Sequence, residues 1–327
     1  MKPKTALGIA LAWLVGVIVH LSFYYHPFSH GAIQELSIPP GSTNAMIARA
    51  LAERELGGHP RLILAYLYLT NQKSLQAGEY FFEIGSPIRD LVRSLTQRIV
   101  GGRRVTFPEG FTSSQMAAVL EQNGICPAED YLALVGNPSH FQKDWLDDVD
   151  TLEGFLFPDT YFFLPSTDAS FIIETQLDRF ERVFMNTFRE EMGVLSLQDT
   201  VILASMVEKE SSILHERPLV ASVFLNRLEK GMRLQSCASV VYAIHQETGQ
   251  YRDVLSLEDL RFDSPFNTYL VDGLPPAPIG NPGLDSLLAA LRPVSSDYLF
   301  FVLTNNGEHA FSRTYQEHLE NRDATAQ

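Results

Sequence analysis

Between residues 31 and 102, the apolar positions recur at the periods of strands and helices in turn. A short strand ends at Ile38, and Ser42 or Thr43 can cap the helix that follows it. The pattern therefore predicts the order strand–helix–helix–strand–helix. After the first strand, its elements fall at residues 46–51, 62–69, 77–85 and 86–95.

From residue 103 onwards, the pattern predicts a larger mixed α/β domain that begins after Gly101-Gly102. Residues 105–107 form a strand, and Thr112 or Ser113 caps a helix that ends at Gly124. Two further segments are predicted: an aromatic-rich module at residues 151–168, and a long amphipathic helix of mixed charge, expected to be a solvated structural element, at residues 168–192.

Residues 1–30 contain an apolar run of the length of a membrane span. No charged side chain occurs from Ala6 to Tyr25, and about 20 apolar residues cross a bilayer as a helix. A cleaved signal peptide would have a shorter apolar core and an Ala-x-Ala-like site, whereas this run ends in interface-type aromatic residues. We expect an uncleaved single-pass anchor in the plasma (inner) membrane. Lys2 and Lys4 predict a cytoplasmic N-terminus, with the remaining chain on the periplasmic or extracytoplasmic side.

Composition restricts the partners. A net charge of −14 disfavours non-specific binding to nucleic acid, which needs clustered Lys and Arg. The hydrophobic content of 45% predicts a sizeable packed core.

Cys126 and Cys237 have no metal-site spacing, and they either pair or remain buried free thiols, of which we favour the second. The histidines form no His-Glu-x-x-His pattern, so we expect no metal and no cofactor.

An apolar helix predicted from Ser196 ends in the segment LASMVEKESS, which carries two glutamates. At about 100° per residue, Glu208 and Glu210 lie roughly 200° apart. We expect Glu208 on a smaller, more polar side and Glu210 on an apolar stripe, which consists of Leu203, Met206 and Val207. Burial raises the pKa of a carboxyl group and suits it to general-acid catalysis. A glutamate that is exposed or paired with Arg217 is the competing interpretation, and spacing alone does not decide between them.

Several longer segments of the chain indicate a protein family more specifically than the spacing of two glutamates does. They are ASMVEKESS, VASVFLNRLEKGMRLQS, FNTYLVDGLPPAPIGNPGLDSLLAAL and YLFFVLTNNGEHAFSRTYQEHLENR, with EGFLFPDTYFF and AGEYFF upstream. Together they closely resemble the YceG-like family of endolytic murein transglycosylases, which are membrane-anchored enzymes that cut nascent peptidoglycan strands. The resemblance spans nearly the whole chain.

The resemblance implies an α+β fold in three parts: a short tail and transmembrane helix (1–30), a small LysM-like module (31–102) and a mixed α/β catalytic domain (103–327). The catalytic domain would contain a lysozyme-like active-site helix with Glu210 as the catalytic residue. The implied partners are peptidoglycan glycan strands and peptidoglycan synthases. The candidate substrate-binding residues are Ser211, Asn226, Gln235, Asn267, Tyr269 and Asn281.

Physical chemistry supports part of this assignment, because amide groups bond to sugar hydroxyls and a tyrosine ring can stack on a sugar. Asn226 and Arg227 could instead be a helix surface that holds Glu208 or Glu216. The Pro/Gly-rich loop GLPPAPIGNPG either lines a groove, which we favour, or only connects elements. The sequence departs from the family at residues 236–238, Ser-Cys-Ala, where relatives often have a small polar residue and then Asp-Pro.

No strong second carboxylate accompanies Glu210, because Glu153 and Asp159 belong to the separate aromatic module. The sequence therefore predicts a single-acid lyase reaction that leaves a 1,6-anhydro-N-acetylmuramic acid (MurNAc) end, in the manner of substrate-assisted glycosidases. Two alternatives stay open. One is a non-catalytic anchored peptidoglycan-binding scaffold for cell-wall synthesis or division proteins, and the other is a muramidase that uses water.

Overall fold

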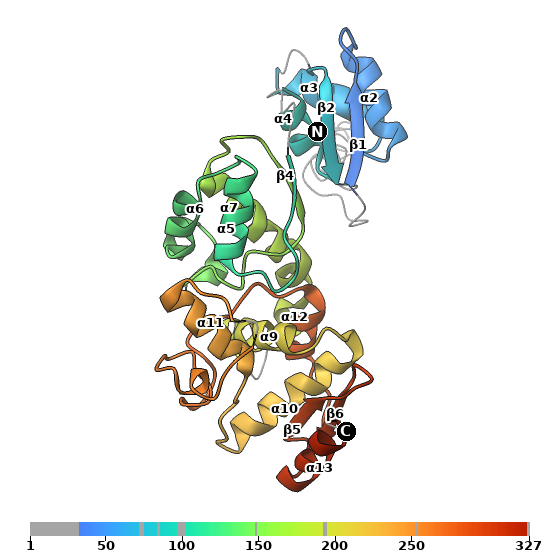
Figure 1. Cartoon of the computed structure of the whole chain (residues 1–327). Coiled ribbons are helices and arrows are strands. Elements are labelled where there is room, and N and C mark those ends of the chain that lie inside the picture. The colour runs from blue at the N-terminus through green and yellow to red at the C-terminus, as the bar shows by residue number, and fades with distance from the viewer. Residues whose placement is uncertain are drawn as a thin grey trace, which may run out of the picture. The chain divides into compact units, whose positions relative to one another are not determined.

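The computed structural model describes residues 33–71, 75–83, 86–96, 103–147, 149–191, 195–252 and 254–325. The chain forms two compact units (Figure 1). The first contains the described residues up to Arg104 together with Phe162–Pro165, and the second contains Val105–Tyr161 and the described residues from Ser166 onwards. The predicted anchor lies outside the described residues. None of the helices within the described ranges is both long and apolar enough to cross a membrane.

The first unit confirms the predicted order of elements: β1 (Ile33–Ile38), α2 (Asn44–Glu53), α3 (Pro60–Leu69), β2 (Gly78–Glu83) and α4 (Ile88–Thr96). The two strands are antiparallel, with Ile38 opposite Gly78. Thr43 is the N-cap of α2, because its hydroxyl accepts a hydrogen bond from the N–H of Met46. Helices and strands share one core, whose fully buried members include Leu36, Leu51, Ile63 and Leu91.

The second unit begins with a helical part. Its helices are α5 (Ser113–Gln122), α6 (Ala128–Val135), α7 (Ala169–Phe180) and α8 (Asn186–Phe188), and the strands β3 (Arg103–Thr106) and β4 (Thr160–Phe163) each have residues in both units. The strands β3 and β4 pair with each other. Thr112 caps α5, since its side chain accepts a hydrogen bond from the N–H of Gln115 and the Gln115 side chain accepts one from the N–H of Thr112.

The long helix predicted over residues 168–192 is interrupted. Asp168 caps α7, but a π-helical turn at Glu181–Met185 separates α7 from α8. The expectation of a solvated element is wrong for one side, because Phe180 and Phe184 are fully buried and their rings pack at 5.6 Å. Phe180 also contacts Phe155, so the aromatic module at residues 151–168 joins the same core.

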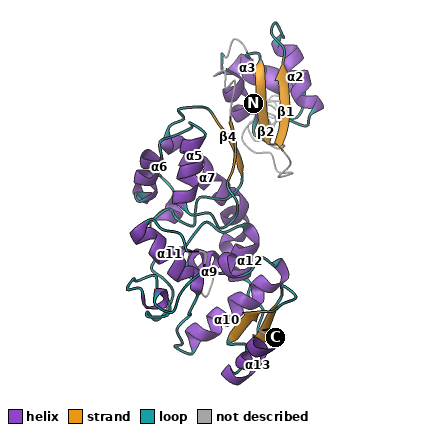
Figure 2. Cartoon of the chain, viewed as in Figure 1, coloured by secondary structure: helices purple, strands orange, loops and turns teal. Residues whose placement is uncertain are grey.

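The elements of the rest of the second unit are α9 (Leu197–Glu210), α10 (Arg217–Glu229), α11 (Cys237–Thr248), α12 (Leu284–Leu291), β5 (Phe300–Leu303), β6 (His309–Ser312) and α13 (Tyr315–Thr325). In this part of the unit, α9 lies among three other helices, and a hairpin with the last helix packs next to α10 (Figures 1 and 2). β5 and β6 form an antiparallel hairpin in which Phe300 lies opposite Ser312. α9 contacts α10, α11 and α12. As predicted, Ser196 caps α9 by accepting a hydrogen bond from the N–H of Asp199.

Enclosure by these neighbours changes the interpretation of α9. Every residue from Thr200 to Val207 is buried, including Ala204 and Ser205 on the side that was expected to be polar. The predicted division into an apolar stripe and a polar side is therefore wrong. A helix that is buried all round carries no solvent side, so periodicity alone could not assign different roles to its two glutamates.

Candidate active site

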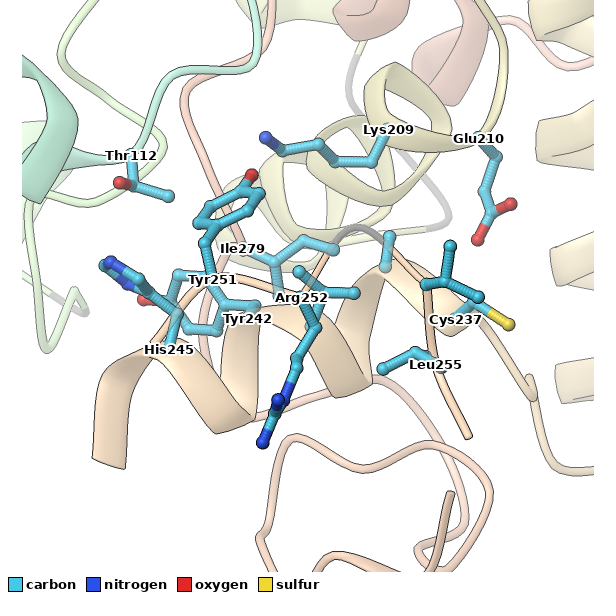
Figure 3. A pocket seen from close by; sticks show the side chains of 13 residues that line it. Thr112, Lys209, Glu210, Cys237, Tyr242, His245, Tyr251, Arg252, Leu255 and Ile279 are labelled. Atoms are coloured by element: carbon cyan, nitrogen blue, oxygen red, sulfur yellow. The ribbon is translucent and has the colours of Figure 1, made fainter. Parts of the chain in front are cut away.

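The last turn of α9 borders an open pocket of about 560 Å³ (Figure 3). Residues of α9 and α11, residues 251, 252, 254 and 255, and the Pro/Gly-rich loop form its walls. Of the described residues that line it, Glu210 is the only carboxylate. The other lining residues are Thr112, Lys209, Cys237, Ala238, Val241, Tyr242, His245, Tyr251, Arg252, Val254, Leu255 and Ile279.

Glu210 is the last residue of α9 and its carboxyl group lies at the start of α11. The hydroxyl of Ser236 donates a hydrogen bond to Glu210 Oε1, and the N–H of Ala238 also donates to this carboxyl group. Burial raises the pKa of Glu210, and this effect outweighs the opposing influence of Ser236, His309 and Ala238. The site thus holds a carboxyl group biased toward its protonated form beside donors that can stabilise it once ionised.

A strained turn brings Ser236 to Glu210. Gln235 has φ +50°, a left-handed conformation that is uncommon for a residue with a side chain. The turn is held by Thr268, whose carbonyl accepts from the N–H of Gln235 at 3.0 Å and whose hydroxyl accepts from the N–H of Ser236 at 2.9 Å. Thr268 is fully buried, whereas the side chain of Gln235 is exposed.

The Pro/Gly-rich loop lines the pocket through Ile279, as predicted. Its position is fixed by α9, because the N–H of Ile279 donates to the hydroxyl of Ser205 at 3.0 Å and the N–H of Gly283 donates to Glu208 Oε2 at 3.0 Å. Ser205 and Glu208 therefore connect the central helix to one wall of the pocket.

Glu208 forms a buried ion pair and does not point to solvent. Arg217 Nη2 lies 2.7 Å from Glu208 Oε1, and the two side chains are only 5% and 6% exposed, respectively. The competing interpretation from the sequence paired Arg217 with Glu210. That pairing is wrong, as is the placement of Glu208 on a polar side, because Arg217 extends across the end of α9 to the first of the two glutamates.

Glu153 is a further buried carboxyl group, and it lies within the aromatic module. It accepts hydrogen bonds from the N–H and hydroxyl of Ser113, at 3.0 and 2.6 Å, and from Asn281 Nδ2 at 2.7 Å. Burial raises its pKa to about 7, against the influence of these donors and of the charge on Lys209. Sequence spacing gave no basis for this placement, and Glu153 does not line the pocket.

Most of the amide side chains proposed for substrate binding are used within the protein. Asn226 Nδ2 donates to two backbone carbonyls, those of Ser296 and Tyr298. Asn267 and Asn281 are fully buried, and their side chains likewise bond to backbone groups, of Leu260, Phe262 and Tyr269 for Asn267 and of Phe111, Gly154 and Leu156 for Asn281. These contacts give the asparagines a role in shaping the walls of the site.

Ser211 and Arg227 also bond internally. Ser211 is buried, and its hydroxyl contacts Ile213 and Glu216. Arg227 donates to the carbonyls of Leu234 and Leu299. The idea that Asn226 and Arg227 hold Glu208 or Glu216 is wrong, since the partner of Glu208 is Arg217 and that of Glu216 is His309, at 2.6 Å.

Gln235 and Tyr269 do not line the pocket, but each lies next to a residue that contacts Glu210 or lines the pocket: Gln235 precedes Ser236, and Tyr269 contacts Cys237. Tyr269 is half-buried, and its hydroxyl lies 3.2 Å from Cys237 Sγ. Cys237 and Cys126 are both free. The expectation of two buried thiols holds for Cys126 but is wrong for Cys237, which is exposed because it occupies the first position of α11 at the pocket.

Sequence reasoning missed Ser236 and Lys209 as site residues. A signal for Ser236 existed, because the departure from the family pattern at residues 236–238 falls on the segment that contacts Glu210. Lys209 lies between two glutamates in sequence and lines the pocket beside Glu210. Nothing in the spacing indicated which side of the helix it occupies.

The fold and the site define an α+β protein in which Glu210, the last residue of the central helix α9, lines a pocket. The sequence model of the YceG-like family matches residues 36–324, and the chain belongs to this family. An endolytic murein transglycosylase of Bacillus subtilis (strain 168) is 32% identical over 300 residues, which cover 86% of this chain and 82% of that protein.

Other relatives agree with this membership. An endolytic murein transglycosylase of Streptococcus pneumoniae (strain ATCC BAA-255 / R6) is 29% identical over 321 residues and 88% of this chain, and the match spans 57% of that longer protein. The 2.6 Å crystal structure of a putative YceG-like protein from Listeria monocytogenes superposes with a TM-score of 0.60 at 30% identity. The superposition covers 89% of this chain and 99% of the Listeria chain.

Proposed function

We propose that this chain is a membrane-anchored endolytic lytic transglycosylase. It cleaves the bond between MurNAc and N-acetylglucosamine (GlcNAc) in nascent peptidoglycan and leaves a 1,6-anhydro-MurNAc end, which limits glycan strand elongation. Membership of the YceG-like family and relatives named endolytic murein transglycosylases support the reaction class. The observation that carries the chemical assignment is Glu210, the only carboxylate among the described residues that line the pocket, with a pKa raised by burial.

In the first step, the protonated Glu210 gives its proton to the glycosidic oxygen, and the bond from that oxygen to C1 of MurNAc breaks. The 2-acetamido group of the same sugar stabilises the positive charge that develops at C1, as in substrate-assisted glycosidases. The ionised Glu210 is then stabilised by the hydroxyl of Ser236 and the N–H of Ala238, which already donate to it. These donors lie at the N-terminal end of α11, where a negative charge is favoured.

In the second step, Glu210 takes the proton from the C6 hydroxyl of MurNAc while the C6 oxygen bonds to C1. The 1,6-anhydro ring closes, GlcNAc has left with the first proton, and Glu210 returns to its protonated form. No water is consumed. One carboxyl group with a raised pKa is therefore sufficient as both acid and base.

The remaining assignments follow from the same proposal. The chain spans the plasma membrane once through residues 1–30, with a cytoplasmic N-terminus. The module at residues 31–102 is a LysM-like peptidoglycan-binding unit, the domain at residues 103–327 is catalytic, and α9 corresponds to the lysozyme-like active-site helix. Gln235 and Tyr269 contact the glycan directly, while Ser211, Asn226, Asn267 and Asn281 position the walls of the cleft. Peptidoglycan synthases are its partners in the membrane.

One experiment tests the function. The purified full-length chain, in mild detergent, is incubated with uncrosslinked glycan strands, and the products are weighed by mass spectrometry. We expect products with anhydro ends from the wild type and intact strands from Glu210→Gln. Substantial cleavage by Glu210→Gln would overturn the assignment, and reducing MurNAc ends would make the protein a hydrolase. Wild-type chain that binds strands without cleaving them would favour the scaffold alternative.

A further inference from the structure

Lys209 enters the same pocket as Glu210 from a different side. Figure 3 shows its side chain extending toward the wall that contains Thr112, while the Glu210 carboxyl group lies at the Cys237 side. The two consecutive residues of α9 thus present an ammonium group and a carboxyl group to separate parts of one pocket. A substrate that reacts at Glu210 would also extend past Lys209.

The aliphatic part of Lys209 runs beside two glycines that come close to each other. A methyl group on Gly280 would lie 3.3 Å from Lys209 Cε and 2.6 Å from the carbonyl oxygen of Gly110. A methyl group on Gly110 would lie 3.7 Å from the same Cε. Both glycines have a positive φ, +154° and +78°. Gly110 and Gly280 therefore leave a narrow space between them and Lys209, here called the glycine slot, through which the lysine side chain reaches the pocket.

The charge of Lys209 lacks a direct partner. Throughout the ranges that the structure describes, Nζ takes part in no hydrogen bond or ion pair. Burial lowers the pKa of Lys209, and the carboxylates of Glu153 and Glu208 oppose this effect only through longer-range attraction. The other cation of the pocket differs, because Arg252 is exposed and lies 4.0 Å from Asp259. A partly desolvated ammonium group gains most from an anion supplied by the ligand.

Peptidoglycan offers one class of anion. The intact glycan chain is neutral, because the lactyl carboxyl group of MurNAc is bound to the peptide stem as an amide. Free carboxylates are found on that stem. We propose that Lys209 binds a stem carboxylate and makes the enzyme selective for strands that carry charged peptide stems. This inference rests on the proposed function, and it adds a specificity-determining residue to the same pocket.

The test changes the charge on both sides of the contact. Uncrosslinked strands with intact stems are divided into two portions, and the stem carboxylates of one portion are converted to neutral methylamides with carbodiimide and methylamine. Cleavage by the full-length chain in detergent is followed by mass spectrometry to obtain kcat and KM. We expect the wild type to show a KM about tenfold lower for charged strands, the size of effect of one charge-assisted hydrogen bond. The kcat should be similar for both substrates.

Two variants locate the effect. Lys209→Met keeps an unbranched chain in the glycine slot but removes the charge, so its KM should be the same for both substrates and close to the wild-type value for neutral strands. Lys209→Arg keeps the charge and should keep a preference for charged strands. Lys230→Gln is the matched control, because Lys230 is an exposed lysine at the end of α10. Its kinetics should equal those of the wild type.

Each failure has its own signature. A wild type without preference for charged strands, or a Lys209→Met variant that retains the preference, overturns the role of Lys209. The wild-type comparison needs no variant, so it decides even if Lys209→Met folds poorly. By contrast, a wild type that cleaves neither substrate overturns the proposed function itself. Strand cleavage that survives Glu210→Gln overturns the role of Glu210 and leaves the charge preference as a separate property.

Discussion

Ser236 donates its hydroxyl hydrogen to Glu210 Oε1, so the residue that precedes α11 bonds to the end of α9 and makes no side-chain cap on its own helix. The hydrogen bond favours the ionised form of Glu210 and partly offsets the effect of burial on its pKa. In the proposed reaction the acid must start protonated. In that proposal, the Ser236 contact lowers the pH above which Glu210 has lost the proton that it must donate.

Ser236→Ala should raise the pKa of Glu210, because it removes a donor to the carboxylate. The active form is protonated, so the alkaline limb of the kcat/KM profile should move to higher pH. Maximal kcat should fall, since the ionised intermediate loses a donor. Strand cleavage measured across pH checks this. An alkaline limb that stays in place or moves to lower pH would show that Ser236 does not act on the acid.

Gln235→Gly tests the strained turn next to Ser236. Glycine adopts the φ of +50° without the steric penalty of a side chain, so the variant should unfold at an equal or slightly higher urea concentration. If the exposed amide contacts the glycan, KM should rise several-fold while kcat changes little. An unchanged KM in a variant of normal stability would assign Gln235 only to the turn.

The sequence predicted those features that depend on local chemistry. Caps at Thr43, Thr112 and Ser196 are read from residue type and offset, and the first unit follows from short, well-punctuated segments. The roles of the two glutamates of α9 could not be predicted in this way. The role of Glu208 depends on its ion pair with Arg217. Arg217 belongs to the next helix, α10, and residues 211–216 separate it from α9.

The same limit applies to the site's asparagines. An Asn in a loop has the same donors and acceptors whether it faces a sugar or a backbone, and only the fold decides which partner it meets. Asn281 meets residues more than a hundred positions earlier in the chain, at Gly154 and Leu156. Long-range contacts of this kind leave no periodic signal in the sequence, whereas Glu210 was marked by a motif.

Glu153 should make the stability of the protein depend on pH. Its pKa is about 7 in the folded state and near 4.5 when exposed in the unfolded chain. Between these values the folded state holds a proton that the unfolded state has lost, so the stabilisation falls as pH rises from about 4.5 to about 7 and stays lost above that. Across this pH range, the protein loses on the order of 3 kcal/mol of unfolding free energy through Glu153.

Glu153→Gln keeps the shape and removes this titration. Urea unfolding of both proteins at pH 5 and pH 8 isolates the contribution, because other titrating groups are common to the two. The difference in unfolding free energy between the two pH values should be smaller for the variant. Equal pH dependence in the two proteins would mean that Glu153 is ionised throughout.

Gly154 and Gly273 form a matched pair for testing close packing beneath the site. Their φ values are similar, +93° and +85°, so alanine should add similar backbone strain at both positions. At Gly154 the new methyl group would also lie 2.6 Å from Pro278 and 2.7 Å from Val201, whereas at Gly273 it meets nothing within 4 Å. Gly154→Ala should therefore be less stable than Gly273→Ala by about 1–3 kcal/mol in urea unfolding. Equal losses would assign the requirement for glycine to φ alone.

The buried pair of Arg217 and Glu208 offers the sharpest test of how α9 is held. Arg217→Met leaves the Glu208 carboxylate buried without its cation, and should cost about 3–5 kcal/mol of unfolding free energy. Glu208→Gln alone also breaks the pair and removes a charged acceptor from the N–H of Gly283. The double variant, with no buried charge left at this point, should recover much of the loss of Arg217→Met. Urea unfolding of the four proteins gives the coupling energy. Losses that simply add would mean that the two side chains stabilise the protein independently, and that the ion pair does not anchor the last turn of α9.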